Sequence, residues 1–392
     1  MTIRKILTKL TIAVLLLTTL CSCGSQEAIE VTVTEDCDYE FFQYRENACS
    51  NEAVVYFELS NEQRLMFYDK QSGVCAPLCG KPECDHTDYA CNAYFSSSDG
   101  LCLYSGKLYR FYESGNTIVC SDTDGTNKTT VRSVNTTLYT ENFTGSYISS
   151  PSSAFHRGWF YYSAGVTVVS AGTTTDYARV IAYPIDSDEE GTLIYSSDEY
   201  KDVAIEPYGD YIYITAYDDS SDDVSRMEIV RYAIETGESE TIYKGERDFS
   251  YHRFTVTDEA IIFCDSTTED YTIYRLAFGE DTIETMCEGT YYYTYGFIGE
   301  NILLGLYTID GFDISIIDLD GNTLMATTVI YEDLEEGRYV IPTIMGTDDD
   351  YIYIDALVWS DEYPYESIIA LSLDGSEQIT LWSNADEVNG EG

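Results

Sequence analysis

The feature that most constrains the fold of this 392-residue chain is a unit that recurs about every 50 residues. Each copy opens with a short segment rich in Tyr, Ile and Phe, which are residues that favour β-strands. These segments are residues 53–57, 107–112, 159–162, 211–214, 260–263, 301–304 and 351–354. A repeat of this length with several strands in each copy is typical of a β-propeller blade. We therefore expect an all-β fold, a β-propeller with seven blades of four antiparallel strands.

A second strand and a tight turn follow in each copy. Residues 122–125 and 318–321 both have the pattern Asp-x-Asp-Gly, and residues 374–375 end a closely similar copy. Glycine supplies the positive φ of a tight hairpin, and Asp tolerates the same region. Calcium binding by these aspartates is the alternative, but the remaining ligand positions and the terminal Glu of an EF-hand loop are absent. We therefore assign the aspartates to the turns.

The ends of the chain suggest how the ring closes. After Gly375 the last copy offers one more strand, at residues 378–382, and residues 28–34 alternate apolar and polar side chains as a strand does. An open ring would leave bare strand edges, which soluble proteins avoid. We therefore expect the N-terminal strand at 28–34 to close the last blade as its outer strand.

The N-terminus has the pattern of a bacterial export signal. Basic residues up to Lys9 precede an apolar stretch at 10–20, which is too short to span a bilayer comfortably. The stretch ends in Leu20-Cys21-Ser22-Cys23-Gly24, which resembles the lipobox of bacterial lipoproteins. On that pattern Cys23 is the lipidation site, and Cys21 fits less well because Leu20 would occupy the small-residue position. An ordinary secretory peptide and an uncleaved anchor are the alternatives.

These features divide the chain into four parts. We expect a lipoprotein signal peptide at 1–22, a lipid-anchored tether at 23–27, a single β-propeller domain at 28–385 with a Cys/His-rich insertion at 75–91, and a disordered tail at 386–392. The protein would then be extracytoplasmic and lipid-anchored to the bacterial cell membrane.

The charge of the chain excludes some partners. There are 69 acidic residues against 21 basic ones, a formal net charge of −48. Such a surface repels nucleic acid and anionic lipid headgroups, and it attracts divalent cations or basic partners. We expect a monomer that binds no nucleic acid and contacts the membrane only through its lipid.

The segment with site chemistry is residues 75–91, which holds four cysteines and one histidine. Cys79, Cys84, His86 and Cys91 form the pattern C-x4-C-x-H-x4-C, three thiolates and one imidazole. That inventory matches a closed tetrahedral site for one structural zinc ion. One or two disulfides are the main alternative, because an exported protein permits them, and a redox or catalytic role is a third. Either a zinc ion or disulfides would give the segment a structural role, not that of an active site.

Disulfides outside this segment are also an alternative. Once Cys21 and Cys23 are set aside, ten cysteines remain, an even number that is consistent with pairing. Cys37 with Cys49 and Cys264 with Cys287 are plausible local bridges.

Several of these features together resemble a known group of proteins. The lipobox, the segment at 78–95 with its preceding strand at 67–70, and the Ile-Tyr strands resemble uncharacterised lipoproteins of anaerobic Firmicutes. The propellers of that group are similar to the YWTD-type propeller of lipoprotein receptors, although no YWTD motif is intact here and Cys75 is an addition to the pattern. The resemblance implies an exported, lipid-anchored propeller, and it carries no known substrate or catalytic residue.

Two classes of function follow. The first is a binding or scaffold module for a protein, peptide or glycan, with aromatic runs at 291–295 and 359–365 as candidate contacts. The second is an enzyme, either a polysaccharide hydrolase or lyase with an acidic central funnel or a peptidase with a propeller gate. Neither G-x-S-x-G nor H-E-x-x-H occurs, and the histidines are His86, His156 and His252. We predict the binding module and name no catalytic residue.

Overall fold

A computed structural model describes residues 47–385, with gaps at 60–61, 82, 88–90, 96–99, 113–116, 134–147, 150–151, 171–172, 188, 219–224, 248–252, 267–269, 291–292, 309–310, 330–338 and 360–364. The chain divides into two compact units, Met1–Thr34 and Glu35–Gly392, and the ring described below belongs to the second. Among the described residues, no helix has the length and apolar character needed to cross a membrane.

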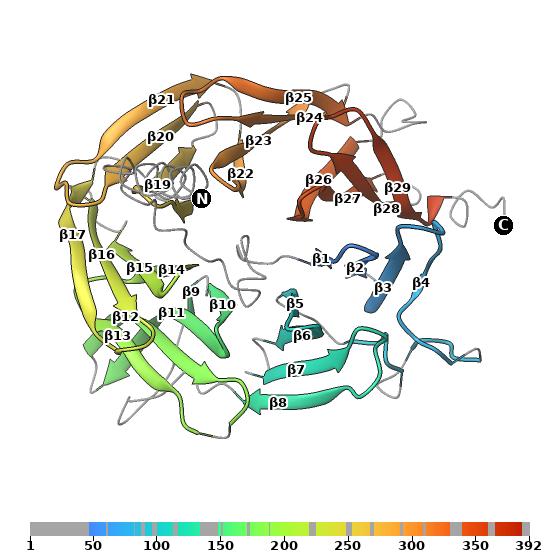
Figure 1. Ribbon diagram of the computed structural model, residues 1–392, viewed down its shortest axis with the longest axis horizontal. Coiled ribbons are helices and arrows are strands. Elements are labelled where there is room, and N and C mark those ends of the chain that lie inside the picture. The colour runs from blue at the N-terminus through green and yellow to red at the C-terminus, as the bar shows by residue number, and fades with distance from the viewer. Residues whose placement is uncertain are drawn as a thin grey trace, which may run out of the picture. The chain divides into compact units, whose positions relative to one another are not determined.

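Seven antiparallel sheets form a ring, which confirms the predicted seven-bladed β-propeller (Figure 1). Blade 1 holds β1 (Ala48–Ser50), β2 (Val54–Leu59), β3 (Arg64–Asp69) and β4 (Cys75–Pro77), and blade 2 holds β5 (Leu101–Tyr104), β6 (Lys107–Tyr112), β7 (Thr117–Asp122) and β8 (Thr129–Ser133). Blade 3 holds β9 (Ile148–Ser149), β10 (Ser153–His156), β11 (Trp159–Ser170), β12 (Thr173–Pro184) and β13 (Thr192–Ser197), and blade 4 holds β14 (Asp202–Tyr208), β15 (Tyr211–Asp218), β16 (Ser225–Ala233) and β17 (Ser239–Arg247). Blade 5 holds β18 (Arg253–Val256), β19 (Ala260–Ser266), β20 (Asp270–Ala277) and β21 (Glu284–Thr290), and blade 6 holds β22 (Tyr293–Ile298), β23 (Asn301–Thr308), β24 (Gly311–Ile317) and β25 (Thr323–Val329). Blade 7 holds β26 (Tyr339–Thr347), β27 (Tyr351–Trp359), β28 (Tyr365–Ser372) and β29 (Gln378–Ser383).

The core lies between neighbouring blades. Side chains alternate along each strand, so one set faces the preceding blade and the other faces the following blade. Phe111 of β6 shows this, since its ring lies 5.5 Å from that of Phe160 and 5.3 Å from that of Tyr162, both on β11 of the next blade. Each such ring removes a large apolar surface from water. The Tyr- and Ile-rich segments are therefore the material that joins one blade to the next.

The predicted ring closure took the wrong strand as the first strand of each blade. Each sequence unit began at the second strand of a blade, because that strand is the most apolar. The strand that appeared to be missing from the last blade is β26, which precedes residue 351, and the outer strand of that blade is β29. Residues 339–383 thus supply four strands by themselves, and the N-terminal segment 28–34 lies outside the described residues.

The carboxylate of Asp348 joins blade 7 to blade 1. It accepts hydrogen bonds from the Ser50 hydroxyl and the Tyr353 hydroxyl, and it lies 3.0 Å from the Lys70 ammonium. Ser50 and Lys70 belong to blade 1, and Tyr353 belongs to blade 7. These hydrogen bonds outweigh the opposing effect of burial and hold the pKa of Asp348 below its ordinary value. We call this contact the Asp348 clasp.

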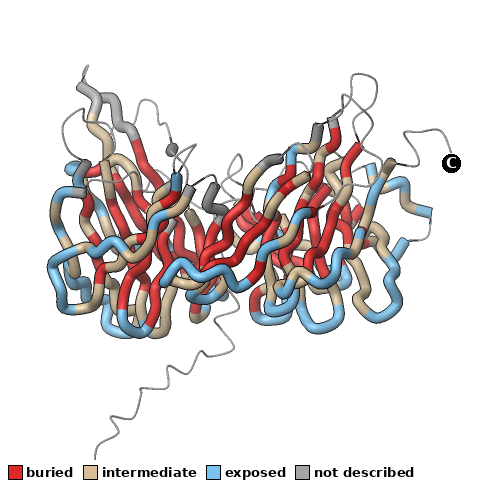
Figure 2. The backbone as a smooth tube through the Cα atoms, turned by 90° about the horizontal axis from the view of Figure 1, so that it is seen from above, coloured by how far each residue is buried: buried red, intermediate tan, exposed pale blue. Residues whose placement is uncertain are grey.

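The two faces of the ring are built differently. The four consecutive strands of each blade are counted in chain order, and in blade 3 they are β10 to β13. The turns between strands one and two and between strands three and four lie on one face of the ring, here called the turn face. The opposite face, where strand two connects to strand three and each blade connects to the next, is called the connection face. Exposed turns gather along one side of the ring in Figure 2. The carboxylates of Asp124, Asp318 and Asp374 accept hydrogen bonds from backbone amides of their own turns, at 2.8, 2.8 and 2.9 Å. Bonds from Ser376 and its neighbours hold the pKa of Asp374 at about 2. These aspartates therefore stabilise their own turns, as the sequence indicated.

Candidate metal centre

Residues 78–95, here called the Cys/His loop, are tied to strand β3 at both ends. The Leu78 amide donates to the Leu65 carbonyl at 2.9 Å, and the Leu65 amide donates to the Ala93 carbonyl at 2.8 Å. The Phe95 amide donates to the Gln63 carbonyl at 3.1 Å. The loop thus leaves blade 1 and returns to the same strand, which brings its first and last residues close together.

The Cys/His loop fills the space between blades 1 and 2. Leu78 and Phe95 are buried with Leu65 of blade 1 and with Leu101 and Leu108 of blade 2 in one apolar cluster. Fully burying a side chain of this kind contributes roughly 1.5–3 kcal/mol. Because the loop packs against both blades, a change in its conformation would disturb the packing of both.

Blade 2 also contacts the polar part of the loop. The Lys128 ammonium donates to the carbonyls of Cys91 and Tyr94 at 3.0 and 3.2 Å. Gly125 has φ +76°, and a Cβ added there would lie 2.6 Å from the Leu78 carbonyl oxygen. The glycine of this turn is thus required by close approach of the loop as well as by its backbone conformation.

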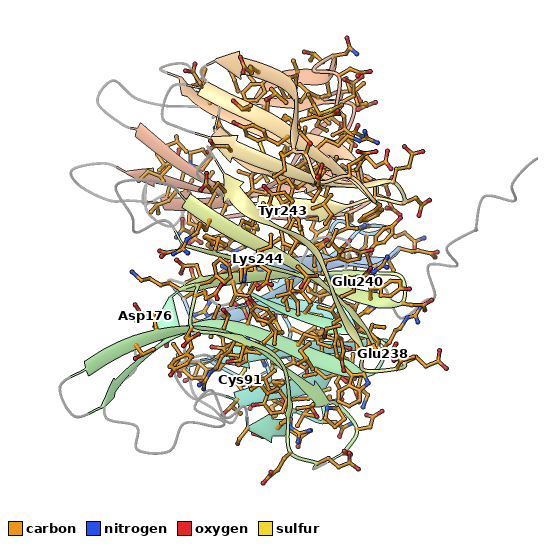
Figure 3. All side chains as sticks on the ribbon, turned by 90° about the vertical axis from the view of Figure 1, so that its left-hand side faces the viewer. Cys91, Asp176, Glu238, Glu240, Tyr243 and Lys244 are labelled. Atoms are coloured by element: carbon orange, nitrogen blue, oxygen red, sulfur yellow. The ribbon has the colours of Figure 1, made fainter. Side chains whose placement is uncertain are left out.

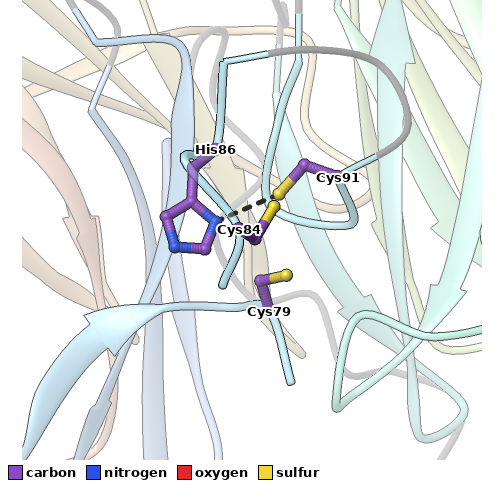
Figure 4. A group of neighbouring side chains, drawn as sticks. All are labelled: Cys79, Cys84, His86 and Cys91. Carbon is purple, nitrogen blue, oxygen red and sulfur yellow. Dashed lines mark hydrogen bonds between the residues drawn. The ribbon is translucent and has the colours of Figure 1, made fainter. Parts of the chain in front are cut away.

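The structure brings the four predicted ligands together. One potential ligand atom from each of Cys79, Cys84, His86 and Cys91 lies within 4.8 Å of the other three. The Nδ1 atom of His86 lies 3.2 Å from Sγ of Cys91, and the side chains converge in Figure 4. Cys79, Cys84 and Cys91 are thiols, not partners in disulfides. The group could hold a metal ion, as three sulfur ligands and one imidazole nitrogen suit a tetrahedral ion.

The thiols of the group have different acidities. Burial raises the pKa of the Cys91 thiol to about 11, with a further contribution from its hydrogen bond with Cys84. Burial acts in the same direction on Cys79, but hydrogen bonds from the Lys81 amide and from Cys91 outweigh it and lower the pKa of that thiol. A cation at the centre would favour the thiolate form of every sulfur ligand.

The other cysteines are placed away from this group. Cys75 lies on β4 and packs against the cluster between blades 1 and 7. Cys264 on β19 and Cys287 on β21 both lie opposite Ile273 of the intervening strand β20. Two strand spacings are about 9.6 Å, beyond the reach of a disulfide, so the bridge expected between Cys264 and Cys287 is wrong. The bridge expected between Cys37 and Cys49 involves a residue outside the described part of the chain.

Of the other candidate site residues from the sequence, one has a structural role and the rest lie wholly or partly outside the described residues. His156 is 1% exposed, and its Nε2 donates to the Gly209 carbonyl of the next blade at 2.8 Å, which is a structural contact. His252 and Cys23 lie outside the described residues. The same holds for residues 291–292 and 360–364 of the two aromatic runs.

Two carboxyl groups that the sequence analysis missed form a largely buried pair. Asp355 on β27 and Glu366 on β28 occupy neighbouring positions on one face of blade 7, and their side chains are hydrogen-bonded to each other. Glu366 is 3% exposed. Burial, together with the charge of Glu366, raises the pKa of Asp355 to about 7. The signal in the sequence was an acidic residue inside the apolar strand 352–358.

We predict that this pair makes stability depend on pH between about 4 and 7. Because the folded-state pKa of Asp355 is raised, its contribution to folding is fully present below its unfolded-state pKa and is lost as the pH rises through 7. The free energy of unfolding of the wild-type protein should fall by about 2–3 kcal/mol more than that of Asp355→Asn between pH 5 and pH 8. Urea titrations at pH 5 and pH 8 measure both proteins. Parallel pH profiles would contradict the prediction.

No protein-family model matches the chain, and no curated protein matches it. Solved structures do share the fold. The acylaminoacyl peptidase of Pyrococcus horikoshii matches with a TM-score of 0.54 and 10% identity over 91% of this chain and 55% of that one. A puromycin-hydrolyzing peptidase of Mycobacterium tuberculosis matches with a TM-score of 0.51 and 10% identity over 88% of this chain and 54% of that one.

A third match is a structure from a study of two prolyl endopeptidases, with a TM-score of 0.50 and 13% identity over 90% of this chain and 51% of that one. The chain thus spans about half the length of each of these three structures. At these identities the likeness establishes the β-propeller class of fold.

Proposed function

We propose that the protein is an extracytoplasmic, lipid-anchored β-propeller that acts as a binding or scaffold module for a protein, peptide or glycan at the bacterial cell surface. The lipobox at Cys23 and the Cys/His segment support a place among the uncharacterised Firmicutes lipoproteins named above. The acidic surface, with a net charge of −48, favours a basic partner.

The observation that carries this proposal is the difference between the two faces. The turn face is made of short turns that satisfy their own polar groups, as at Asp124 and Asp374. Blade 3 extends two strands beyond the others on the connection face. The Asp348 clasp joins blades 7 and 1, and the Cys/His loop packs between blades 1 and 2, so both tie neighbouring blades together. A rigid ring with one elaborated face is suited to binding because few groups need to be ordered when a partner docks.

We further propose that the Cys/His loop holds one structural zinc ion. Three thiolates and one imidazole fill all four positions of a tetrahedral ion and leave none for a substrate. The place of the loop between blades 1 and 2 supports a role in stability.

The polysaccharide hydrolase or lyase is the weaker alternative. Asp355 and Glu366 are the clearest carboxyl pair, but they are hydrogen-bonded to each other inside blade 7. Glycoside hydrolases separate their two carboxyl groups by about 5 Å or more so that the sugar can lie between them. His156 is held in a contact between blades. We therefore do not propose either enzyme.

Anchoring has a direct test. In a bacterial host that processes lipoproteins, the wild-type chain should fractionate with the membrane and incorporate labelled palmitate. The Cys23→Ser variant should lose both properties, and Cys21→Ser should retain them, because only Cys23 follows a small residue at the lipobox position. Labelling of Cys23→Ser would contradict the assignment.

Binding is tested with the purified soluble part of the chain on a glycan array and by capture from solubilised envelopes. The proposal predicts a saturable partner that is displaced by excess untagged protein. Turnover of a polysaccharide with no saturable partner would favour the enzyme.

A further inference from the structure

Three thiols of the Cys/His loop lie close enough to one another to react together. The potential ligand atoms of Cys79, Cys84 and Cys91 lie within 4.8 Å of one another. The Cys91 side chain is hydrogen-bonded to the side chains of both Cys84 and Cys79. A disulfide joins sulfur atoms about 2.0 Å apart, so two of these sulfur atoms need to approach by less than about 3 Å to form one. The residues that could hold a metal ion can therefore also form a disulfide.

The three thiols differ in how far solvent reaches them. Cys91, labelled in Figure 3, is 1% exposed. Cys79 and Cys84 are partly exposed, and Cys84 lies between the exposed residues Glu83 and Asp85. Oxidation of a cysteine depends on its exposure and on its thiolate character, which a bound cation promotes. A soluble oxidant can thus reach Cys84, while Cys91 is shielded and lies beside it.

The backbone of this group has an uncommon conformation at one residue. His86 has φ +57°, in the left-handed region that residues with a Cβ rarely adopt. Its Nδ1 atom lies 3.2 Å from Sγ of Cys91. Coordination of an ion by both side chains would offset the cost of this conformation. Loss of the ion removes that compensation and favours rearrangement of the segment.

We propose that the Cys/His loop is a peroxide-sensitive zinc site, in which oxidation of Cys84 and Cys91 to a disulfide releases the ion. This inference rests on the proposed zinc site and deepens it. The oxidant is hydrogen peroxide, which carries no charge and is not repelled by a chain with a net charge of −48.

The reaction has two steps. The Cys84 thiolate attacks one oxygen of hydrogen peroxide, the O–O bond breaks, and a sulfenic acid and a hydroxide ion form. The Cys91 thiolate then attacks the sulfenic sulfur, the S–O bond breaks, and a disulfide and a second hydroxide ion form. The two thiolates lose two electrons and the peroxide gains them. Zinc keeps its charge and leaves, because only Cys79 and His86 remain as ligands.

Release of the ion would act on the outer edge of blade 1. Strand β4 ends at Pro77, which pairs with Met66 of β3. Beyond this pair the returning loop covers the same edge, where the Leu65 amide donates to the Ala93 carbonyl at 2.8 Å. Cys91 precedes Ala93 by two residues. A change of Cys91 from metal ligand to disulfide partner is therefore expected to weaken this hydrogen bond.

The test uses full-length wild-type protein purified with a reductant and moved anaerobically into buffer without it. Hydrogen peroxide is added in small molar excess, zinc release is followed with a chromophoric indicator, and the remaining thiols are alkylated for peptide mapping. We expect loss of one zinc ion per chain, a disulfide between Cys84 and Cys91, and alkylated Cys79. Deuterium exchange at the Leu65 amide should become faster. A dithiol reductant with added zinc should reverse these changes.

Cys75→Ser is the matched control, because Cys75 lies outside the ligand group and packs between blades 1 and 7. It should release zinc and form the same disulfide as the wild type. Zinc that stays bound in excess peroxide would overturn the inference and leave the proposed zinc site standing. Release without a disulfide, or with a disulfide that includes Cys79, would also overturn it. Reductant-purified wild-type protein that holds no zinc would reject the proposed site and this inference together.

Discussion

Cys84→Ser is expected to abolish stoichiometric zinc binding and to lower the free energy of unfolding by about 4 kcal/mol, or the thermal midpoint by roughly 6 °C. The reason is the position of the ligand group. Cys79, Cys84, His86 and Cys91 close a loop whose Leu78 and Phe95 are buried between blades 1 and 2. Without the ion, three thiols and an imidazole no longer fix the loop, and the buried contacts of two blades lose their support.

Cys75→Ser is the matched control. Cys75 lies in the same segment but packs against the cluster between blades 1 and 7, so this variant should keep one zinc ion per chain. Elemental analysis and thermal unfolding, with and without a chelator, measure both variants. Purified wild-type protein with no metal and no titratable thiols in this segment would contradict the metal assignment and favour disulfides.

The second large effect is expected at the Asp348 clasp. Asp348→Ala should lower the free energy of unfolding by about 3–5 kcal/mol. The substitution removes the acceptor for the Ser50 and Tyr353 hydroxyls and the partner of the Lys70 ammonium, and it leaves these donors in a partly buried site. These contacts join the first and last blades, so their loss weakens the junction between the two ends of the described chain.

The neighbouring variant Asp350→Ala separates this effect from a general loss of charge. Asp350 is exposed and interacts with Asp348 through its backbone amide, so its substitution should change stability by less than about 0.5 kcal/mol. Urea unfolding at pH 7 measures both. Because the pKa of Asp348 is lowered, the contribution of the clasp should be present at neutral pH and lost as the pH falls through the depressed pKa. Equal losses in the two variants would contradict the role of the clasp.

The repeat was predictable because blade strands obey local rules. Period-two alternation and turn residues such as Gly125 and Gly375 act over a few residues, so the sequence displays them directly. The phase of the repeat was harder to assign. Inner strands such as β26 are interrupted by Pro342 and Gly346, so they are less conspicuous than the apolar second strands.

The Cys/His group was predictable for the same reason, since its four members lie within 13 residues, from Cys79 to Cys91. The Asp348 clasp was not, because Ser50 and Asp348 are 298 residues apart and nothing local marks them as partners. The pair of Asp355 and Glu366 depends on strand register, and the separation of Cys264 from Cys287 depends on the strand between them. Contacts of this kind follow from the closed ring.

The most direct test of the central claim, that the connection face of the ring receives the partner, is photo-cross-linking in intact cells. A photoreactive amino acid would replace either Asp270, the first residue of β20, or Glu280, in the turn that follows β20; both are exposed acidic residues. Asp270 lies on the connection face and Glu280 on the turn face. The account predicts a discrete adduct from position 270 and none from position 280. An adduct from position 280 alone would contradict it.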